Sequence, residues 1–383
     1  MKKKIIFLFI IIVLISFGIL IKTSFNKEES SLQDNSSKQI KEENFLSMML
    51  ETSAGSGEYE MVTQSSWPTD GYIFNAELSK CENGGKLSWN DTNKVVTMTS
   101  NMSDKCYVYF DIVPSITLTE YVISQYNGVQ GNNNIYYHDE TLANGAGDNS
   151  YRYAGASSSV NNYVCFGSDD DTCPADNLYR IIGVIDGKVK LIKATPLDDM
   201  DMVWDSNNSN TWSTSSLNTY LNGTYLETFS EDWQAKIATT TWKDGGIDDI
   251  EVRAATMYTN EMNSTTSGTD GYPSKVALMY AHDYGFAANP TAWTTTLFNY
   301  DENDSTGTSI TTNNWLYLGF VEWIVSRDSH NSTTSYYVDL NGCVCYSDDV
   351  TETHLVRPVL FLETSVEYSS GSGTLSDLIR IVM

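Results

Sequence analysis

The sequence has few of the side chains that build metal centres and hydrolase active sites. Its 383 residues include only four histidines, His138, His282, His330 and His354, and none lies in an HExxH or His-x-His spacing. A zinc site is therefore not predicted. No Gly-x-Ser-x-Gly segment occurs either, which argues against a serine hydrolase of the α/β type.

Basic residues are also scarce. The chain has 23 lysines and arginines against 49 aspartates and glutamates, so its formal net charge is −26. A surface this acidic is repelled by phosphate backbones, and nucleic acid is not a predicted partner.

Acidic clusters raise the alternative of calcium, which takes six to eight oxygen ligands in a rigid loop. No cofactor is predicted, with calcium at these clusters as the one alternative to solvated acidic loops. Residues 205–210 begin like an EF-hand loop, but the sixth and twelfth positions are Asn210 and Ser216. The clusters are Asp169-Asp170-Asp171, Asp198-Asp199-x-Asp201, Asp248-Asp249, Asp301-Glu302-x-Asp304 and Asp348-Asp349.

Only one long apolar run is present, at residues 5–21. Its 17 residues would form a helix of about 26 Å, close to the thickness of a hydrocarbon core. Three lysines precede it, so the positive-inside rule predicts a cytosolic N-terminus and an extracellular bulk. We expect residues 1–22 to be an uncleaved, single-pass anchor in the plasma membrane, with a cleaved, secreted form as the alternative.

Composition divides the rest of the chain into three parts. Residues 23–58 are polar and charged and predict a stalk, with a short helix over 42–50. Short β-rich runs separated by turn residues predict a small antiparallel β-module over 59–112. Residues 113–383 form the third part, which we expect to be an α+β domain.

Two of the six cysteines lie in the β-module. Cys81 and Cys106 would close a loop of about 25 residues, and a disulfide there would stabilise the module by roughly 3 kcal/mol. We predict this bond, since exported proteins keep their disulfides.

The other four cysteines leave alternatives open. Cys343 and Cys345 would share one face of a strand about 6.5–7 Å apart, so we do not expect them to bond each other unless the strand is broken. They could cross-link to Cys165 and Cys173. We favour a local Cys165–Cys173 bond, which leaves the oxidation state of the other pair undetermined.

Several elements are predicted in the third part. Residues 118–126 favour a short helix capped by Thr117, and residues 211–241 favour further helix. Asp186-Gly187 and Asn341-Gly342 each predict a two-residue β-hairpin. Arg357 lies in an apolar strand and needs a carboxylate partner. The tryptophans in Asn/Thr-rich segments are expected in the core, with stacking on a sugar as the alternative: Trp204, Trp212, Trp293 and Trp315.

The order of several segments resembles an uncharacterised family of bacterial cell-surface modules. These segments are YRIIGVI, SLNTYLNGTYL, VALMYAHDYGFAA, VDLNGCVCYSDD and VRPVLFL, and the resemblance covers about residues 160–383. Its most specific parts are Trp323–Arg327 and Val356–Leu362. The family looks related to the C-type-lectin-like fold shared by formylglycine-generating-enzyme-like domains, which implies such a fold for the C-terminal domain. The calcium triplets of sugar-binding lectins and the cysteine spacing of those enzymes are missing.

These observations favour a membrane-anchored extracellular binding or adhesion protein that recognises a glycan or protein ligand. One alternative is an extracellular enzyme acting on cell-surface polysaccharide, and another is a structural surface spacer. A non-enzymatic role is favoured and no catalytic residue is predicted. The sequence leaves the ligand-binding residues unknown.

Overall fold

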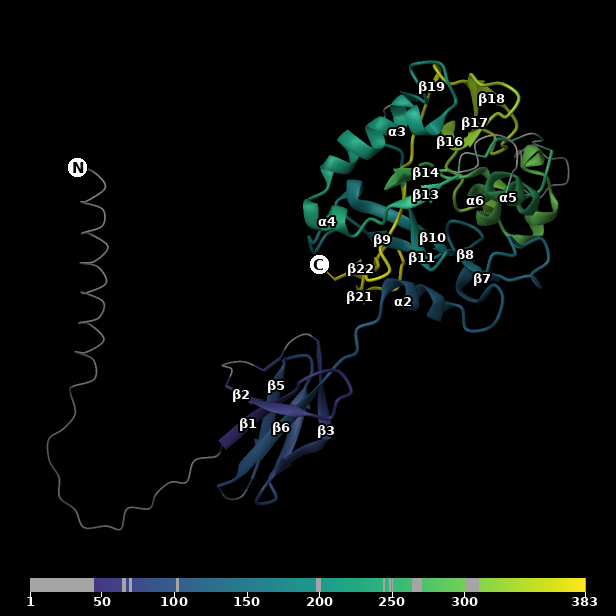
Figure 1. Ribbon diagram of the computed structural model, residues 1–383. Helices are drawn as coiled ribbons and strands as arrows, with labels where there is room; N and C mark the ends of the chain where they lie inside the picture. The colour runs from purple at the N-terminus through teal and green to yellow at the C-terminus, as the bar shows by residue number, and fades with distance from the viewer. Residues whose placement is uncertain are drawn as a thin grey trace, which may run out of the picture. The chain divides into compact units, whose positions relative to one another are not determined.

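The computed structural model shows two compact units, Met1–Pro114 and Ser115–Met383 (Figure 1). It describes residues 45–382 except for short gaps, so the apolar run at 5–21 lies outside the described residues. The gaps are at 64–66, 69–70, 101–102, 198–200, 244, 248, 250, 264–270 and 301–309.

The small unit is a four-stranded sheet with a β-hairpin packed on it. The strands run in the order β2 (Tyr59–Val62), β1 (Phe45–Glu51), β6 (Lys105–Ile112) and β3 (Tyr72–Cys81), and the hairpin is β4 (Lys86–Asn90) and β5 (Val95–Thr99). β1 and β6 run parallel, so the prediction of a wholly antiparallel module is wrong.

Alternating side chains explain why β1 is a strand. Met48 and Leu50 point inward and join Val108 and Phe110 in a compact core. Trp89 of the hairpin packs edge-on against Phe110, with ring centroids 5.1 Å apart. The helix predicted over 42–50 is therefore wrong for residues 45–50, because this period of two buries one face of a strand.

A disulfide joins the end of β3 to the start of β6, where Cys81 and Cys106 are direct partners in the ladder. Replacing both with alanine is expected to lower the free energy of unfolding of the small unit by about 3 kcal/mol, since the bond restricts the unfolded chain. Urea unfolding of the full chain measures this. The Cys165→Ala/Cys173→Ala variant is the control, since its bond spans 8 residues instead of 25. A loss below about 1 kcal/mol for the first variant would contradict the loop-entropy argument.

The large unit is organised around one mixed set of β-strands. The central sheet has the order β15 (Val276–Ala277), β20 (Val359–Phe361), β11 (Lys188–Lys193), β10 (Leu178–Ile185), β8 (Ser150–Tyr153) and β7 (Ile135–His138), and β9 (Tyr163–Cys165) also pairs with β10. The smaller sheets are β16 (Glu322–Arg327) with β17 (Thr334–Val338) and β18 (Ser347–Asp349), β12 (Met202–Val203) with β19 (Thr353–His354), β13 (Thr240–Trp242) with β14 (Tyr272–Ser274), and β21 (Tyr368–Ser370) with β22 (Arg380–Ile381).

The hairpin of β10 and β11 follows its predicted turn. Ile185 pairs with Lys188, and the two residues between them, Asp186 and Gly187, have φ angles of 51° and 73°. Positive φ at both central positions is what a type I′ turn needs, and Asp-Gly supplies it. This prediction is confirmed.

Helices in the described residues are few and short. They are α2 (Leu118–Gln125), α3 (Ser216–Tyr220), α4 (Glu231–Ala235), α5 (Ala254–Asn263) and α6 (Ala281–Ala287), with short 3-10 turns and one π turn at Leu221–Tyr225. The protein is thus mostly β-sheet, and the predicted α+β class with a transmembrane helix and a C-type-lectin-like domain is wrong.

The membrane prediction is corrected by the same helices. In the part of the chain that the structure describes, no helix is both long enough and apolar enough to span a bilayer. The longest, α5, has 10 residues, whereas a transmembrane helix needs about 20. The prediction of a single-pass plasma-membrane protein with an extracellular bulk is therefore not upheld.

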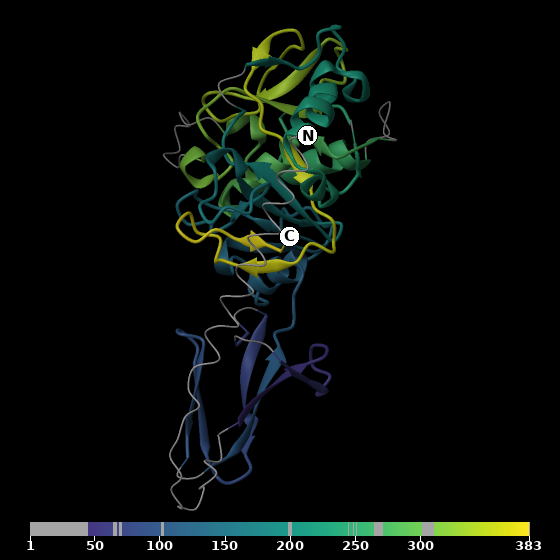
Figure 2. The same ribbon diagram turned by 90° about the vertical axis from the view of Figure 1, so that its left-hand side faces the viewer.

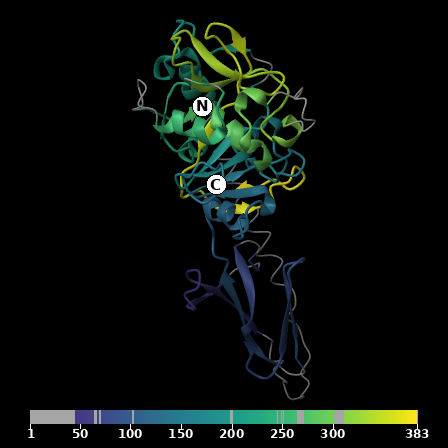
Figure 3. The same cartoon turned by 90° about the vertical axis from the view of Figure 1, so that its right-hand side faces the viewer.

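Helix α2 lies against the C-terminal strands at one end of the large unit, while β16, β17 and β18 lie at the other end (Figures 2 and 3). Thr117 and Glu120 form a capping box at the start of α2, so the predicted helix and its cap are confirmed. Tyr121 stacks on Tyr368 with ring centroids 3.9 Å apart. The chain's C-terminal segment thus closes this end.

Tryptophans form much of the core of the large unit. The four in Asn/Thr-rich segments are at most 1% exposed, so the predicted core position is confirmed and stacking on a sugar is wrong for them. Burial satisfies their ring N–H groups as well: Trp315 donates to the carbonyl of Tyr153 at 2.8 Å, and Trp293 to that of Ala288 at 3.0 Å.

Candidate functional site

A pocket of about 270 Å³ opens in the large unit between the β10–β11 hairpin and the helical segment that follows. Its lining combines aromatic rings, hydroxyl groups and one pair of opposite charges. The lining residues are Asp176, Asn177, Tyr179, Lys193, Leu197, Tyr220, Tyr225, Thr228 and Phe229.

Local helix chemistry brings the second half of the lining into place. Ser215 accepts from the backbone N–H of Asn218 and so caps α3. The helix then widens into the π turn at Leu221–Tyr225, a feature frequent at functional sites. The side chain of Asn222 bonds the backbone N–H and carbonyl of Val276, at 3.0 and 2.8 Å, which fixes this turn against the central sheet.

Two buried phenols meet at the bottom of the pocket. The hydroxyl groups of Tyr179 and Tyr225 are hydrogen-bonded to each other. Burial raises the pKa of both hydroxyls, so both stay protonated at neutral pH. Since only one of the two protons lies between the oxygens, the pair keeps a further donor and further acceptor capacity for a ligand.

Charges of both signs stand at the rim. Lys193 is buried at the end of β11, and its Nζ donates to the backbone carbonyl of Asp176 at 3.1 Å. The same nitrogen lies 3.6 Å from Oδ1 of Asp176, whose side chain is 74% exposed. An exposed partner leaves this ion pair weak, so a ligand can replace the carboxylate at little cost.

This arrangement suits recognition better than catalysis. Hydrolysis of a glycosidic bond usually needs two carboxyl groups flanking the bond, and Asp176 is the one carboxylate among the described residues that line the pocket. Aromatic rings with hydrogen-bonding groups between them are typical of sites for small polar ligands.

A second pocket of about 270 Å³ contains the acidic cluster Asp169-Asp170-Asp171, together with Trp233 and Arg380. Arg380 donates to the backbone carbonyls of Asp170 and Asp171 at 2.9 and 2.8 Å. The Cys165–Cys173 disulfide closes the same loop. These contacts account for the loop's conformation by themselves.

The other candidate calcium residues are not brought together among the described residues. Asp205 accepts from the backbone N–H groups of Asn207 and Ser209, both at 3.1 Å, and so closes its own loop. Asp349 accepts from Thr351 in the same way. Residues 198–199, 248 and 301–304 lie outside the described residues, and calcium stays a prediction.

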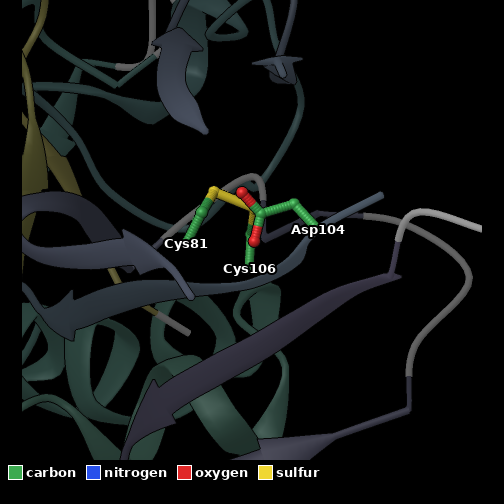
Figure 4. Close-up of side chains that lie close together, drawn as sticks. All are labelled: Cys81, Asp104 and Cys106. Carbon is green, nitrogen blue, oxygen red and sulfur yellow. A yellow bond between two sulfur atoms is a disulfide. The ribbon is translucent and has the colours of Figure 1, made fainter. Parts of the chain in front are cut away.

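The cysteines lie in three separate bonds. Cys81–Cys106 and Cys165–Cys173, the pairs singled out in the sequence, are disulfides. Beside the first bond the carboxylate of Asp104 approaches the sulfur atoms (Figure 4). This carboxylate accepts from the backbone N–H groups of Asn83 and Gly85, at 2.7 and 2.8 Å, so it serves the turn.

The third bond corrects an expectation. Cys343 and Cys345 are joined to each other, although the sequence predicted that they would not be. The reason is that residues 339–346 form a loop between β17 and β18 and not a strand, so the two side chains are no longer held apart. The two-residue hairpin predicted at Asn341-Gly342 is wrong for the same reason.

Sequence reasoning missed all the pocket residues. Tyr179 and Tyr225 are 46 positions apart and belong to different elements, and a tyrosine in a β-rich run looks like core. A usable signal was Lys193, a charged residue at the end of an apolar strand that is covered on both sides.

Comparison with known families places residues 186–364 close to one family, whose description is Domain of unknown function (DUF6273). The matched range contains Lys193 and Tyr225 of the pocket but begins after Tyr179. No curated protein and no solved structure matches the chain. The resemblance to bacterial cell-surface modules stays a prediction.

Proposed function

We propose that the protein is a binding or adhesion protein whose large unit recognises a glycan, with one sugar residue seated in the pocket between Tyr179 and Tyr225. The observation that carries this proposal is the lining itself: half-buried and buried tyrosines, a lysine and a threonine around a space for one sugar ring. Sugars present hydroxyl groups to polar side chains and an apolar C–H face to aromatic rings.

The disulfides fit such a role. Three of them suit a protein that works where thiols are oxidised, which is where glycans of cell surfaces and secretions are met. The acidic balance of the chain favours neutral or basic sugars over sulfated or phosphorylated ones, since like charges repel.

The test is a glycan array probed with the full chain, followed by titration calorimetry with the best ligand. Tyr220→Ala and Lys193→Met are each expected to weaken binding at least about tenfold, because each removes a stacking or hydrogen-bonding group worth about 1–3 kcal/mol. Tyr346→Ala is the matched control, since this tyrosine is exposed and lies outside the lining.

Two results would overturn the proposal. One is an array without any bound glycan. The other is a bound glycan whose affinity is unchanged in both pocket variants, which would place recognition elsewhere. Thermal unfolding of each variant shows whether a loss of binding comes from a loss of fold.

A further inference from the structure

The loop between β17 and β18 is held firmly by the core. Asp339 donates its backbone N–H to the carbonyl of Cys343 at 2.8 Å, which closes the loop on itself. The hydroxyl of Tyr284, a buried residue, donates to the carbonyl of Gly342 at 2.7 Å. Between the two cysteines, Val344 is fully buried and donates its backbone N–H to the carbonyl of Leu297 at 3.2 Å.

This anchoring holds the two cysteines together independently of their bond. Their Cα atoms are 5.3 Å apart, and the anchored residue lies between them. If the bond is reduced, the backbone contacts of Gly342 and Val344 remain, and the two sulfur atoms stay close.

A carboxylate completes the group. Oδ2 of Asp339 lies 3.8 Å from Sγ of Cys343, and the ligand atoms of Asp339, Cys343 and Cys345 all lie within 4.8 Å of one another. Two thiolates and one carboxylate are ligands that Zn²⁺ and Cd²⁺ prefer, and three protein ligands leave a fourth position open.

This bond is also the one that the fold needs least. It spans two residues, whereas the others span 25 and 8, and the stabilisation from a disulfide grows with the length of the closed loop. The similar group at Cys81, Asp104 and Cys106 differs in both respects, because its bond closes the longest loop and its carboxylate is held by the backbone of the turn.

We propose that Asp339, Cys343 and Cys345 form a redox-gated site for a thiophilic divalent cation. A dithiol reductant breaks the sulfur–sulfur bond: two electrons and two protons pass to the cysteines, two thiols form, and the reductant becomes a disulfide. Binding of the cation then releases the two thiol protons to solvent, and reoxidation closes the site. This inference is independent of the glycan proposal and uses none of the pocket residues.

The test begins with selective reduction of the full chain by limiting dithiothreitol, removed by gel filtration under argon. Alkylation and peptide mapping are expected to label Cys343 and Cys345 before the other four cysteines. Cd²⁺ added to this sample is expected to bind with one ion per chain and to produce thiolate-to-metal absorption in the ultraviolet, whereas the oxidised chain shows none.

Matched variants decide which residues hold the ion. Cys343→Ser/Cys345→Ser, treated in the same way, is expected to lose this absorption, and Asp339→Asn is expected to bind at least about tenfold more weakly. Far-ultraviolet circular dichroism reports whether each variant keeps its fold, and Cys345→Ser alone serves where the double variant does not. Prior reduction of another pair, no Cd²⁺ signal in the reduced chain, or unchanged binding in Asp339→Asn would each overturn the proposal.

Discussion

Replacing Asp283 with asparagine is expected to lower the free energy of unfolding of the large unit by about 3–5 kcal/mol, because two buried cations lose their shared counter-charge. Oδ2 of Asp283 lies 2.5 Å from Nζ of Lys190, and Oδ1 lies 3.2 Å from Nη1 of Arg152. All three side chains are at most 2% exposed, so water cannot replace the lost charge. Urea unfolding followed by tryptophan fluorescence measures the loss.

The matched control is Asp176→Asn, which also removes a carboxylate paired with a lysine. That pair is exposed, so the expected change is within about 0.5 kcal/mol. A loss below about 1 kcal/mol in Asp283→Asn would mean that Lys190 and Arg152 do not depend on this carboxylate.

Acid unfolding should show the same group. Burial acts to raise the pKa of Asp283, but the charges of Lys190, His282 and Arg152 outweigh it and hold the pKa well below the usual value of 3.8. A depressed pKa gives stability that is fully present above the unfolded value and is lost as the pH falls below it. We expect the stability of the wild type to fall more steeply below about pH 4 than that of Asp283→Asn.

Glu322→Leu is expected to cost a similar amount, about 3–5 kcal/mol, because it leaves the guanidinium of Arg357 buried without its partner. The pair is bidentate: Nε and Nη2 of Arg357 each lie 2.6 Å from a carboxylate oxygen of Glu322. Neither side chain is more than 4% exposed. Equilibrium unfolding of the single variant gives the value.

A double replacement separates the pair from its surroundings. Glu322→Leu/Arg357→Met removes both charges, and we expect it to recover most of the loss, to within about 1–2 kcal/mol of the wild type. The remainder reflects the carbonyl of Leu316, which loses the hydrogen bond from Arg357. If the double variant is less stable than Glu322→Leu, the argument from an uncompensated buried charge fails.

Two similar dipeptides show where local prediction works. Asp186-Gly187 forms its predicted turn because the strands on both sides pair without interruption. Asn341-Gly342 does not, because burial of Val344 and the contacts of Gly342 and Val344 with other elements pull the chain into a longer loop. Partners distant in the sequence decide the second case.

The buried charges were predictable only in part. Arg357 was expected to need a carboxylate, and Glu322 supplies it. Which of the many carboxylates would do so depended on the sheet arrangement. The network around Asp283 was not found, because its members lie on β8, β11 and α6, and the segment containing α6 was taken for a strand.

The parallel pairing of β1 with β6 affects how the small unit responds to force. These are its first and last described strands, and residues Phe45–Leu50 pair with Lys105–Phe110. Because the strands are parallel, the chain enters and leaves this pair at opposite ends. Tension on the two ends would therefore slide the strands along each other and load all of their hydrogen bonds together. An antiparallel pair would open one bond at a time, so the small unit is built to resist being pulled.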